Sequence, residues 1–130
     1  MRLVVDTNVI VSALLHPGRT PDVALTRILG GEHVVLVDGR VRAEYADVLA
    51  RKKFASIDVH RRTQLLAALE SRAEAVVVSP SDIVLIDEDD RVFVEVAESG
   101  RADGIVTGNA KHFPRDRGFG VWSPAEWLTI

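Results

Sequence analysis

The chain has 130 residues, of which 47% are hydrophobic and 27% charged, so it is long enough to fold as one independent domain. It has no cysteine, which excludes a disulfide framework and a thiolate metal site and fits a reducing cytoplasm. The formal net charge is -3, so no overall basicity indicates a nucleic-acid partner, and no apolar run reaches the ~20 residues of a membrane-spanning helix. We therefore expect a single cytoplasmic domain, residues 1–130, with no membrane association.

Short apolar strands alternate with helices along the first half of the chain. Strands are predicted at Arg2 to Val5 and at His33 to Val37. Helices are predicted at Val9 to Leu15, from the N-cap Thr20 to Gly30-Gly31, from the cap Asp38 to about Lys53, and at Val59 to Ala73.

The second half continues this alternation. Extended segments are predicted at Ala75 to Val78, Ile83 to Ile86, Gly104 to Thr107 and Gly118 to Val121, with a helix at Asp90 to Ser99 and a helical turn starting at Ser123. Strands that are apolar throughout and alternate with helices indicate an α/β fold, in which helices cover both faces of a parallel sheet.

An aspartate follows the first predicted strand. In parallel α/β sheets the carboxyl ends of the strands bind ligands, so Asp6 is a candidate functional residue. The alternative is that Asp6 only caps the helix that begins near Thr7.

A glutamate lies beside the apolar stripe of the helix that follows Asp38. Glu44 comes three residues after Val41 and four before Val48, so its side chain points towards the buried face. The alternatives are a salt bridge to Arg40 or Lys52, or a position at the solvent edge of the stripe.

Four consecutive acids precede the helix at Asp90 to Ser99. Acids at a helix N-terminus complement the helix dipole, which is sufficient to explain Glu88 and Asp89. Asp90 instead shares a face with Phe93 and should point inward, and Asp87, three residues earlier, can approach the same place.

The segment ADGIVTGNAKHF repeats the design of the opening strand. Asp103 precedes the predicted strand, and Thr107 and Asn109 follow it. If the two strands are neighbours, Thr107 and Asn109 lie beside Asp6. The alternatives are a turn role for Asp103 and a left-handed loop conformation for Asn109.

Carboxylates that converge in this way must be protonated or share a cation, because unit charges about 4 Å apart repel by roughly 4 kcal/mol at an effective dielectric of 20. Oxygen ligands without cysteine or paired histidines indicate Mg²⁺ or Mn²⁺. Since Mg²⁺ completes its coordination with water and phosphate oxygens, phosphodiester hydrolysis is the expected chemistry.

Four motifs in this order resemble the PIN-domain ribonucleases, and in particular the VapC-like toxin branch of toxin–antitoxin systems. The motifs are VVDTNVIVSALL, the glutamate-containing helix from Glu44 to Leu49, DEDDRVFVEVA and ADGIVTGNAKHF, which together span nearly the whole chain. The resemblance implies a three-layer α/β/α sandwich with a central, mostly parallel sheet. It also implies a Mg²⁺- or Mn²⁺-dependent endoribonuclease that hydrolyses RNA, an antitoxin partner and a homodimer. Apolar helix positions could supply these protein interfaces: Leu25 and Leu29, or Leu65, Leu66 and Leu69.

The resemblance assigns roles to individual residues. Asp6, Glu44 and Asp90 would be catalytic and bind the metal. Asp103 and Asn109 would also be metal ligands, although Asn109 stands where many members have aspartate. Supporting roles fall to Thr7, Asp87 and Thr107.

Basic residues lie near two of these motifs and could contact RNA phosphates. They are Arg51, Lys52 and Lys53 after the glutamate helix, and Lys111 and His112 after the TGN step.

Two other readings remain open. A phosphatase with a nucleophilic Asp6 would need a second aspartate two residues on, where the chain has Asn8. A catalytically weak or inactive PIN-like module that binds RNA or protein is the stronger alternative, because Asn109 contributes no charge.

Overall fold

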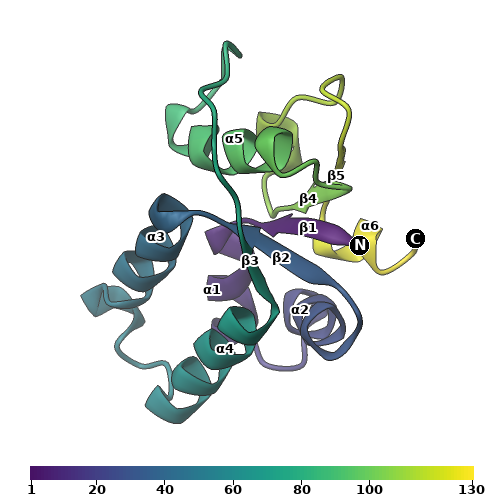
Figure 1. Cartoon of the computed structure of the whole chain (residues 1–130). Helices are drawn as coiled ribbons and strands as arrows, with labels where there is room; N and C mark the ends of the chain where they lie inside the picture. Colours follow the sequence, from purple (N-terminus) through teal and green to yellow (C-terminus); the bar gives the residue numbers. More distant parts are fainter.

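The computed structural model describes residues 1–130, which form one five-stranded parallel sheet in the order β3-β2-β1-β4-β5 (Figure 1). The strands are β1 (Arg2–Val5), β2 (Val34–Val37), β3 (Ala73–Ala75), β4 (Gly104–Val106) and β5 (Gly120–Trp122). The helices are α1 (Thr7–Leu15), α2 (Thr20–Gly30), α3 (Gly39–Leu49), α4 (Val59–Arg72), α5 (Arg91–Ser99) and α6 (Pro124–Trp127). Single 3₁₀ turns occur at η1 (Lys52–Phe54), η2 (Glu88–Asp90) and η3 (Ala110–His112).

Helices cover both faces of the sheet, as the apolar strands require. In Figure 1, α1, α2 and α4 lie on one side of the sheet and α5 lies on the other. Leu3, Val4 and Val5 of the central strand β1 are fully buried. The α/β/α sandwich predicted from the sequence is therefore confirmed.

The chain reverses direction across the sheet at the boundary between β1 and β4. It proceeds outward from β1 to β3 and then returns through α5 to β4, on the other side of β1. The register pairs Leu3 with Gly104 and Val5 with Val106, so both strands end at the same edge. Such a switch point is where ligands bind in open α/β sheets.

Several predicted boundaries shift by a few residues. The predicted strand Ala75 to Val78 is β3 at Ala73–Ala75, because α4 ends at Arg72 and leads directly into it. After Val76, whose N–H donates to the Val37 carbonyl, the chain leaves the sheet, and the predicted extended segment Ile83 to Ile86 pairs with no strand.

The helix predicted to run to about Lys53 ends at Leu49 and is followed by η1. Thr20 is the first residue of α2, and the N-cap is Arg19.

Two of the apolar positions expected to form protein interfaces are in the core instead. Leu25 is 1% exposed and Leu69 is 4% exposed. No helix is both long and apolar enough to cross a membrane.

Candidate active site

Asp6 is held at the carboxyl end of β1 by hydrogen bonds on both its backbone and its side chain. Its N–H donates to the Val106 carbonyl at 2.9 Å, which extends the β1–β4 ladder by one residue. Its Oδ2 accepts from the Thr107 hydroxyl at 2.8 Å, and that hydroxyl oxygen accepts from the Asn109 N–H at 3.0 Å. The hydroxyl proton of Thr107 is therefore committed to Asp6, and the carboxylate has a fixed orientation.

The Asp6 carboxyl is only 6% exposed, and its burial raises its pKa above the ordinary value. The hydrogen bond from Thr107 and those from the backbone N–H groups of Asn8 and Thr7 favour the charged form and oppose this rise, while the charge of Glu44 adds to it. Hydrogen-bond donors therefore offset part of the cost of burying the Asp6 carboxylate, and a second acid, Glu44, lies nearby.

Glu44 reaches the same region from α3. Its Oε2 accepts from the Thr7 hydroxyl at 2.7 Å, so the residue that follows Asp6 orients the glutamate. The next residue, Tyr45, is buried, and its hydroxyl donates to the Val5 carbonyl, which ties α3 to the end of β1. Burial and the charges of Asp6 and Glu44 raise the pKa of Tyr45, so its phenol stays neutral and remains a donor.

Asp90 enters the site from the opposite side of the switch point, at the junction of η2 and α5. The residue is 9% exposed, and its buried Oδ2 has no hydrogen-bond partner. Burial raises its pKa to about 6, the charges of Asp6 and Asp87 add to the rise, and His112 opposes it. A buried carboxylate oxygen without a donor carries a desolvation cost that a bound cation would remove. The residues present therefore fit a divalent cation.

Asp87 and His112 lie next to Asp90. Asp87 caps η2 by accepting from the Asp89 N–H at 2.9 Å, and His112 Nδ1 is 3.8 Å from Asp90 Oδ2. One ligand atom from each of Asp87, Asp90 and His112 lies within 4.8 Å of the others. His112, which we expected on an RNA-binding surface, is therefore part of the acidic site.

The TGN step connects the loops around Asp6. The Gly108 N–H donates to Asn8 Oδ1 at 3.0 Å, which joins the loop after β4 to the start of α1. Asn109 is exposed next to this contact. The predicted proximity of Thr107 to Asp6 is confirmed by their direct hydrogen bond.

The structure does not bring Asp103 to this site. Asp103 Oδ2 accepts from the Arg2 N–H at 2.6 Å, and the Asp103 N–H donates to the Arg2 carbonyl at 2.7 Å. Both residues are at the start of their strands, at the amino edge of the sheet. The expectation that Asp103 is a metal ligand was wrong, because a residue that precedes a parallel strand lies at the edge opposite the one where that strand ends.

A network around Glu95, which the sequence analysis missed, fixes the approach to η2. Glu95 is 5% exposed and accepts from Arg40 Nη1 and from the Ser81 N–H, both at 2.8 Å. Arg91 donates to the carbonyls of Ser81 and Ile83 at 2.9 and 2.8 Å. The network thereby joins α3, which carries Glu44, to α5 and to the segment leading to Asp87. The available signal was a single acid inside the apolar run VFVEVA.

The predicted RNA-binding residues occupy two places. Arg51, Lys52 and Lys53 are exposed in and before η1, whereas Lys111 is exposed in η3, directly before His112. Two other arginines make hydrogen bonds within the protein: Arg61 donates to the Leu14 carbonyl and Arg62 to the Leu49 carbonyl.

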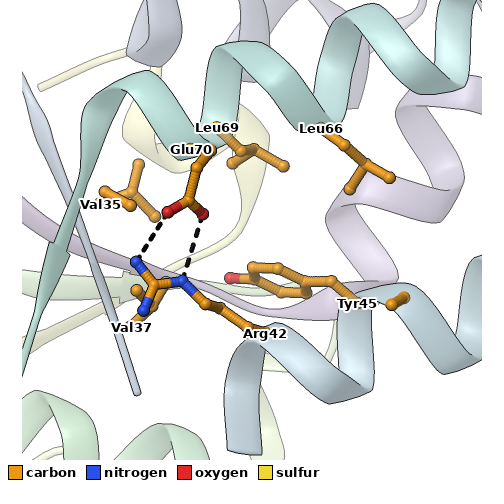
Figure 2. A pocket seen from close by; sticks show the side chains of 9 residues that line it. Val35, Val37, Arg42, Tyr45, Leu66, Leu69 and Glu70 are labelled. Carbon is orange, nitrogen blue, oxygen red and sulfur yellow. Dashed lines mark hydrogen bonds and ion pairs between the residues drawn. The ribbon is translucent and has the colours of Figure 1, made fainter. Parts of the chain in front are cut away.

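An apolar cavity of about 140 Å³ lies between α3, α4 and the sheet, and it is separate from the acids (Figure 2). Figure 2 shows that Tyr45 lines it and that Arg42 and Glu70 face each other across it. Arg42 donates to both carboxylate oxygens of Glu70, at 2.8 and 3.2 Å. Since its one carboxylate is neutralised by this ion pair, the cavity lacks the chemistry of the site around Asp6.

These observations define an α/β protein with a cluster of acidic residues at the switch point of a parallel sheet. The family model of the PIN domain matches residues 2–111, and the chain belongs to this family. One solved structure with the same fold is the crystal structure of VapBC2 from Rickettsia felis bound to a DNA fragment from their promoter. The match has a TM-score of 0.61 at 19% identity and covers 95% of this chain and 98% of the other. No curated protein sequence matches the chain significantly.

Proposed function

We propose that this chain is a divalent-metal-dependent endoribonuclease that hydrolyses phosphodiester bonds in RNA. PIN-domain proteins are usually nucleases, and the observation that carries the proposal here is the buried, unpartnered Oδ2 of Asp90 beside Asp6. A cluster of acids that concentrates desolvated negative charge in this way is suited to Mg²⁺ or Mn²⁺, which prefer oxygen ligands.

Asp6, Glu44 and Asp90 would hold the cation, and the carbonyl oxygen of the Asn109 side chain would replace the fourth acid of many relatives. Asp103 has no part in this set, because it lies at the other edge of the sheet. Thr107 and Thr7 hold Asp6 and Glu44 in position through their hydroxyl groups.

The mechanism divides the work between the acids. A bound divalent cation supplies Lewis acidity and makes a water molecule more acidic. Asp6 and Asp90 contribute the buried negative charge that binds the cation. Glu44 is less buried than the two aspartates and would either ligate the cation or accept the proton of the attacking water. The products would carry 5′-phosphate and 3′-hydroxyl ends.

Exposed basic residues would bind the RNA backbone. Lys111 follows the TGN step, and Arg51, Lys52 and Lys53 present a second group of charges after α3. His112 is only partly exposed and lies beside Asp90. Lys53 Nζ lies 5.0 Å from the Phe54 ring centroid, which partly orders that turn.

We also propose that the chain is the toxin of a toxin–antitoxin pair. The structural neighbour VapBC2 was crystallised on DNA from its promoter, and the sequence resembles the VapC-like branch over nearly its whole length. The partners would then be a cognate antitoxin, RNA and a second copy of the chain, in the cytoplasm.

A non-catalytic PIN-like module that binds RNA or protein is the second candidate. Asn109 favours it, because an amide in place of a carboxylate lowers the negative charge available to a cation.

Mn²⁺ titration of metal-stripped protein by calorimetry tests the nuclease proposal without requiring the natural RNA. The variants are Asp6→Asn and Asp90→Asn, with Asp89→Asn as a matched control from the same acidic run. We expect wild type and Asp89→Asn to bind Mn²⁺ and the other two to lose binding. Cleavage of a mixed RNA pool should then depend on Mn²⁺ and stop in chelator.

Absence of Mn²⁺ binding by folded wild-type protein would contradict the nuclease proposal. Binding without any cleavage would favour the non-catalytic module.

A further inference from the structure

We propose that His112, with Asp87 and Asp90, forms a second cation position in which an imidazole ligand selects Mn²⁺ over Mg²⁺. This inference rests on the function proposed above, because Asp90 belongs to both sets of ligands. Its starting point is the group Asp87, Asp90 and His112, whose ligand atoms lie within 4.8 Å of one another.

The backbone of η3 places His112 beside the acids. The His112 N–H donates to the Asn109 carbonyl at 2.9 Å, and the Asn109 N–H donates to the Thr107 hydroxyl at 3.0 Å. The His112 backbone is thus linked, through Asn109, to the same threonine that orients Asp6. His112 and the candidate catalytic carboxylates form one connected structure.

The separation of His112 and Asp90 suits two ligands of one ion better than a direct hydrogen bond. His112 Nδ1 and Asp90 Oδ2 are 3.8 Å apart, beyond hydrogen-bonding distance. Two ligands that are each about 2.1 Å from a metal lie roughly 3 to 4 Å apart, depending on whether they are cis or trans. The buried Oδ2 of Asp90 also has no other partner in the protein.

Asp87 can supply the third ligand without losing its structural role. One of its carboxylate oxygens, Oδ1, accepts from the Asp89 N–H, which leaves the other oxygen available. The residue is exposed, so water can complete the coordination of the ion.

The site around Asp6 and Glu44 is a separate position that shares Asp90. Neither Asp6 nor Glu44 belongs to the close group with His112, yet the charge of Asp6 acts directly on Asp90. Asp90 would therefore contribute to both positions, and two cations are commonly used in phosphodiester hydrolysis. His112 thereby offsets the loss of a fourth acid at Asn109.

The ligand chemistry predicts the metal preference. Both cations take oxygen ligands, but Mg²⁺ takes almost nothing else, whereas the transition metal Mn²⁺ also accepts an imidazole nitrogen. Two carboxylates and one imidazole therefore favour Mn²⁺, and this preference should depend on a single side chain.

The test compares Mn²⁺ and Mg²⁺ binding by calorimetry in wild type, His112→Gln and Asp87→Asn. His60→Gln is the control, because His60 is an exposed histidine on α4 that is remote in sequence from the acids. We expect His112→Gln to weaken Mn²⁺ binding by at least about tenfold and Mg²⁺ binding by no more than about twofold, and His60→Gln to change neither.

A second measurement identifies the ligand atom. Titration with diamagnetic Zn²⁺, followed by ¹⁵N NMR of the histidine side chains, should shift Nδ1 of His112 and leave His16, His33 and His60 unchanged.

The outcomes separate the two proposals. If wild type binds Mn²⁺ in a manner that requires Asp6, but His112→Gln binds it equally well and Nδ1 does not shift, the inference about His112 is wrong and the nuclease proposal stands. If wild type binds no cation, both proposals fail.

Discussion

Replacement of Asp90 by asparagine should stabilise the metal-free protein at neutral pH, although it removes a proposed metal ligand. In the folded protein the pKa of Asp90 is raised from its ordinary value of 3.8 to about 6. The folded state therefore binds the proton more tightly than the unfolded state, and ionisation of Asp90 costs stability as the pH rises from about 4 through 6. Asparagine resembles the protonated carboxyl and does not pay this cost.

The size of the effect follows from the pKa difference. At about 1.4 kcal/mol for each pKa unit, the rise from 3.8 to about 6 corresponds to at most about 3 kcal/mol. Partial hydration of the Asp90 carboxyl, whose side chain is 12% exposed, reduces this to about 1–2 kcal/mol. The Asp90 side chain caps no backbone N–H, so the substitution removes no helix cap that would offset the gain.

Urea unfolding in chelator at pH 4 and pH 7.5 measures this effect, with Asp89→Asn as the control. The advantage of Asp90→Asn should be small at pH 4 and largest at pH 7.5. Asp89→Asn should show a much smaller trend, because the Asp89 charge is the weakest contributor to the raised pKa of Asp90. In Mn²⁺ at 100 times its Kd, wild type should become more stable than Asp90→Asn, because wild type then gains about 2.7 kcal/mol of stability from binding. If Asp90→Asn is less stable than wild type in chelator at pH 7.5, the ionised Asp90 carboxylate does not destabilise the folded protein.

Three further substitutions test the contacts that build the site. Thr107→Val should lower the free energy of unfolding by about 1–3 kcal/mol and raise the pKa of Asp6, because a buried carboxylate loses its hydrogen-bond donor. Thr107→Ser should restore both quantities. Urea unfolding measures the first and NMR titration of the carboxyl group measures the second. Glu95→Gln should destabilise the protein by about 1–3 kcal/mol at pH 7. The Ser81 N–H and Arg40 hold the pKa of Glu95 below its ordinary value. The difference in stability between wild type and Glu95→Gln should therefore disappear as the pH falls below about 4. A difference in stability that does not change with pH would contradict this prediction. Gly104→Ala should lower the free energy of unfolding by about 1–3 kcal/mol and change the tryptophan fluorescence, because a Cβ would collide with the Trp122 ring. If the variant unfolds at the same temperature as wild type, Gly104 and the Trp122 ring are not in this close contact.

Local rules applied to the sequence were sufficient for the main features of the fold. The apolar strands predicted a parallel sheet because such strands must be covered on both faces, and this was confirmed. Helical periodicity predicted that Asp90 points inward, and the residue is buried. Boundaries moved where one element leads directly into the next, as at the junction of α4 and β3.

The acids illustrate what sequence position alone cannot supply. Asp103 resembled Asp6 as an acid next to a strand, but it precedes β4 whereas Asp6 follows β1. Strand polarity therefore separates them by the full length of the strand. The error was one of topology rather than of residue chemistry.

The sequence alone was enough to predict a parallel α/β domain in which Asp6 and Thr107 each follow a strand, so that they meet if those strands are neighbours. The pairing of β1 with β4, which makes them neighbours, is a feature of the folded structure. Only the tertiary structure decided that His112 approaches Asp90 and that Glu95 ties α3 to α5. Those contacts depend on a short turn and on the packing of segments distant in the chain. Side-chain positions set by turns and long-range ion pairs leave no periodic pattern in the sequence, so they emerge only when the chain is folded.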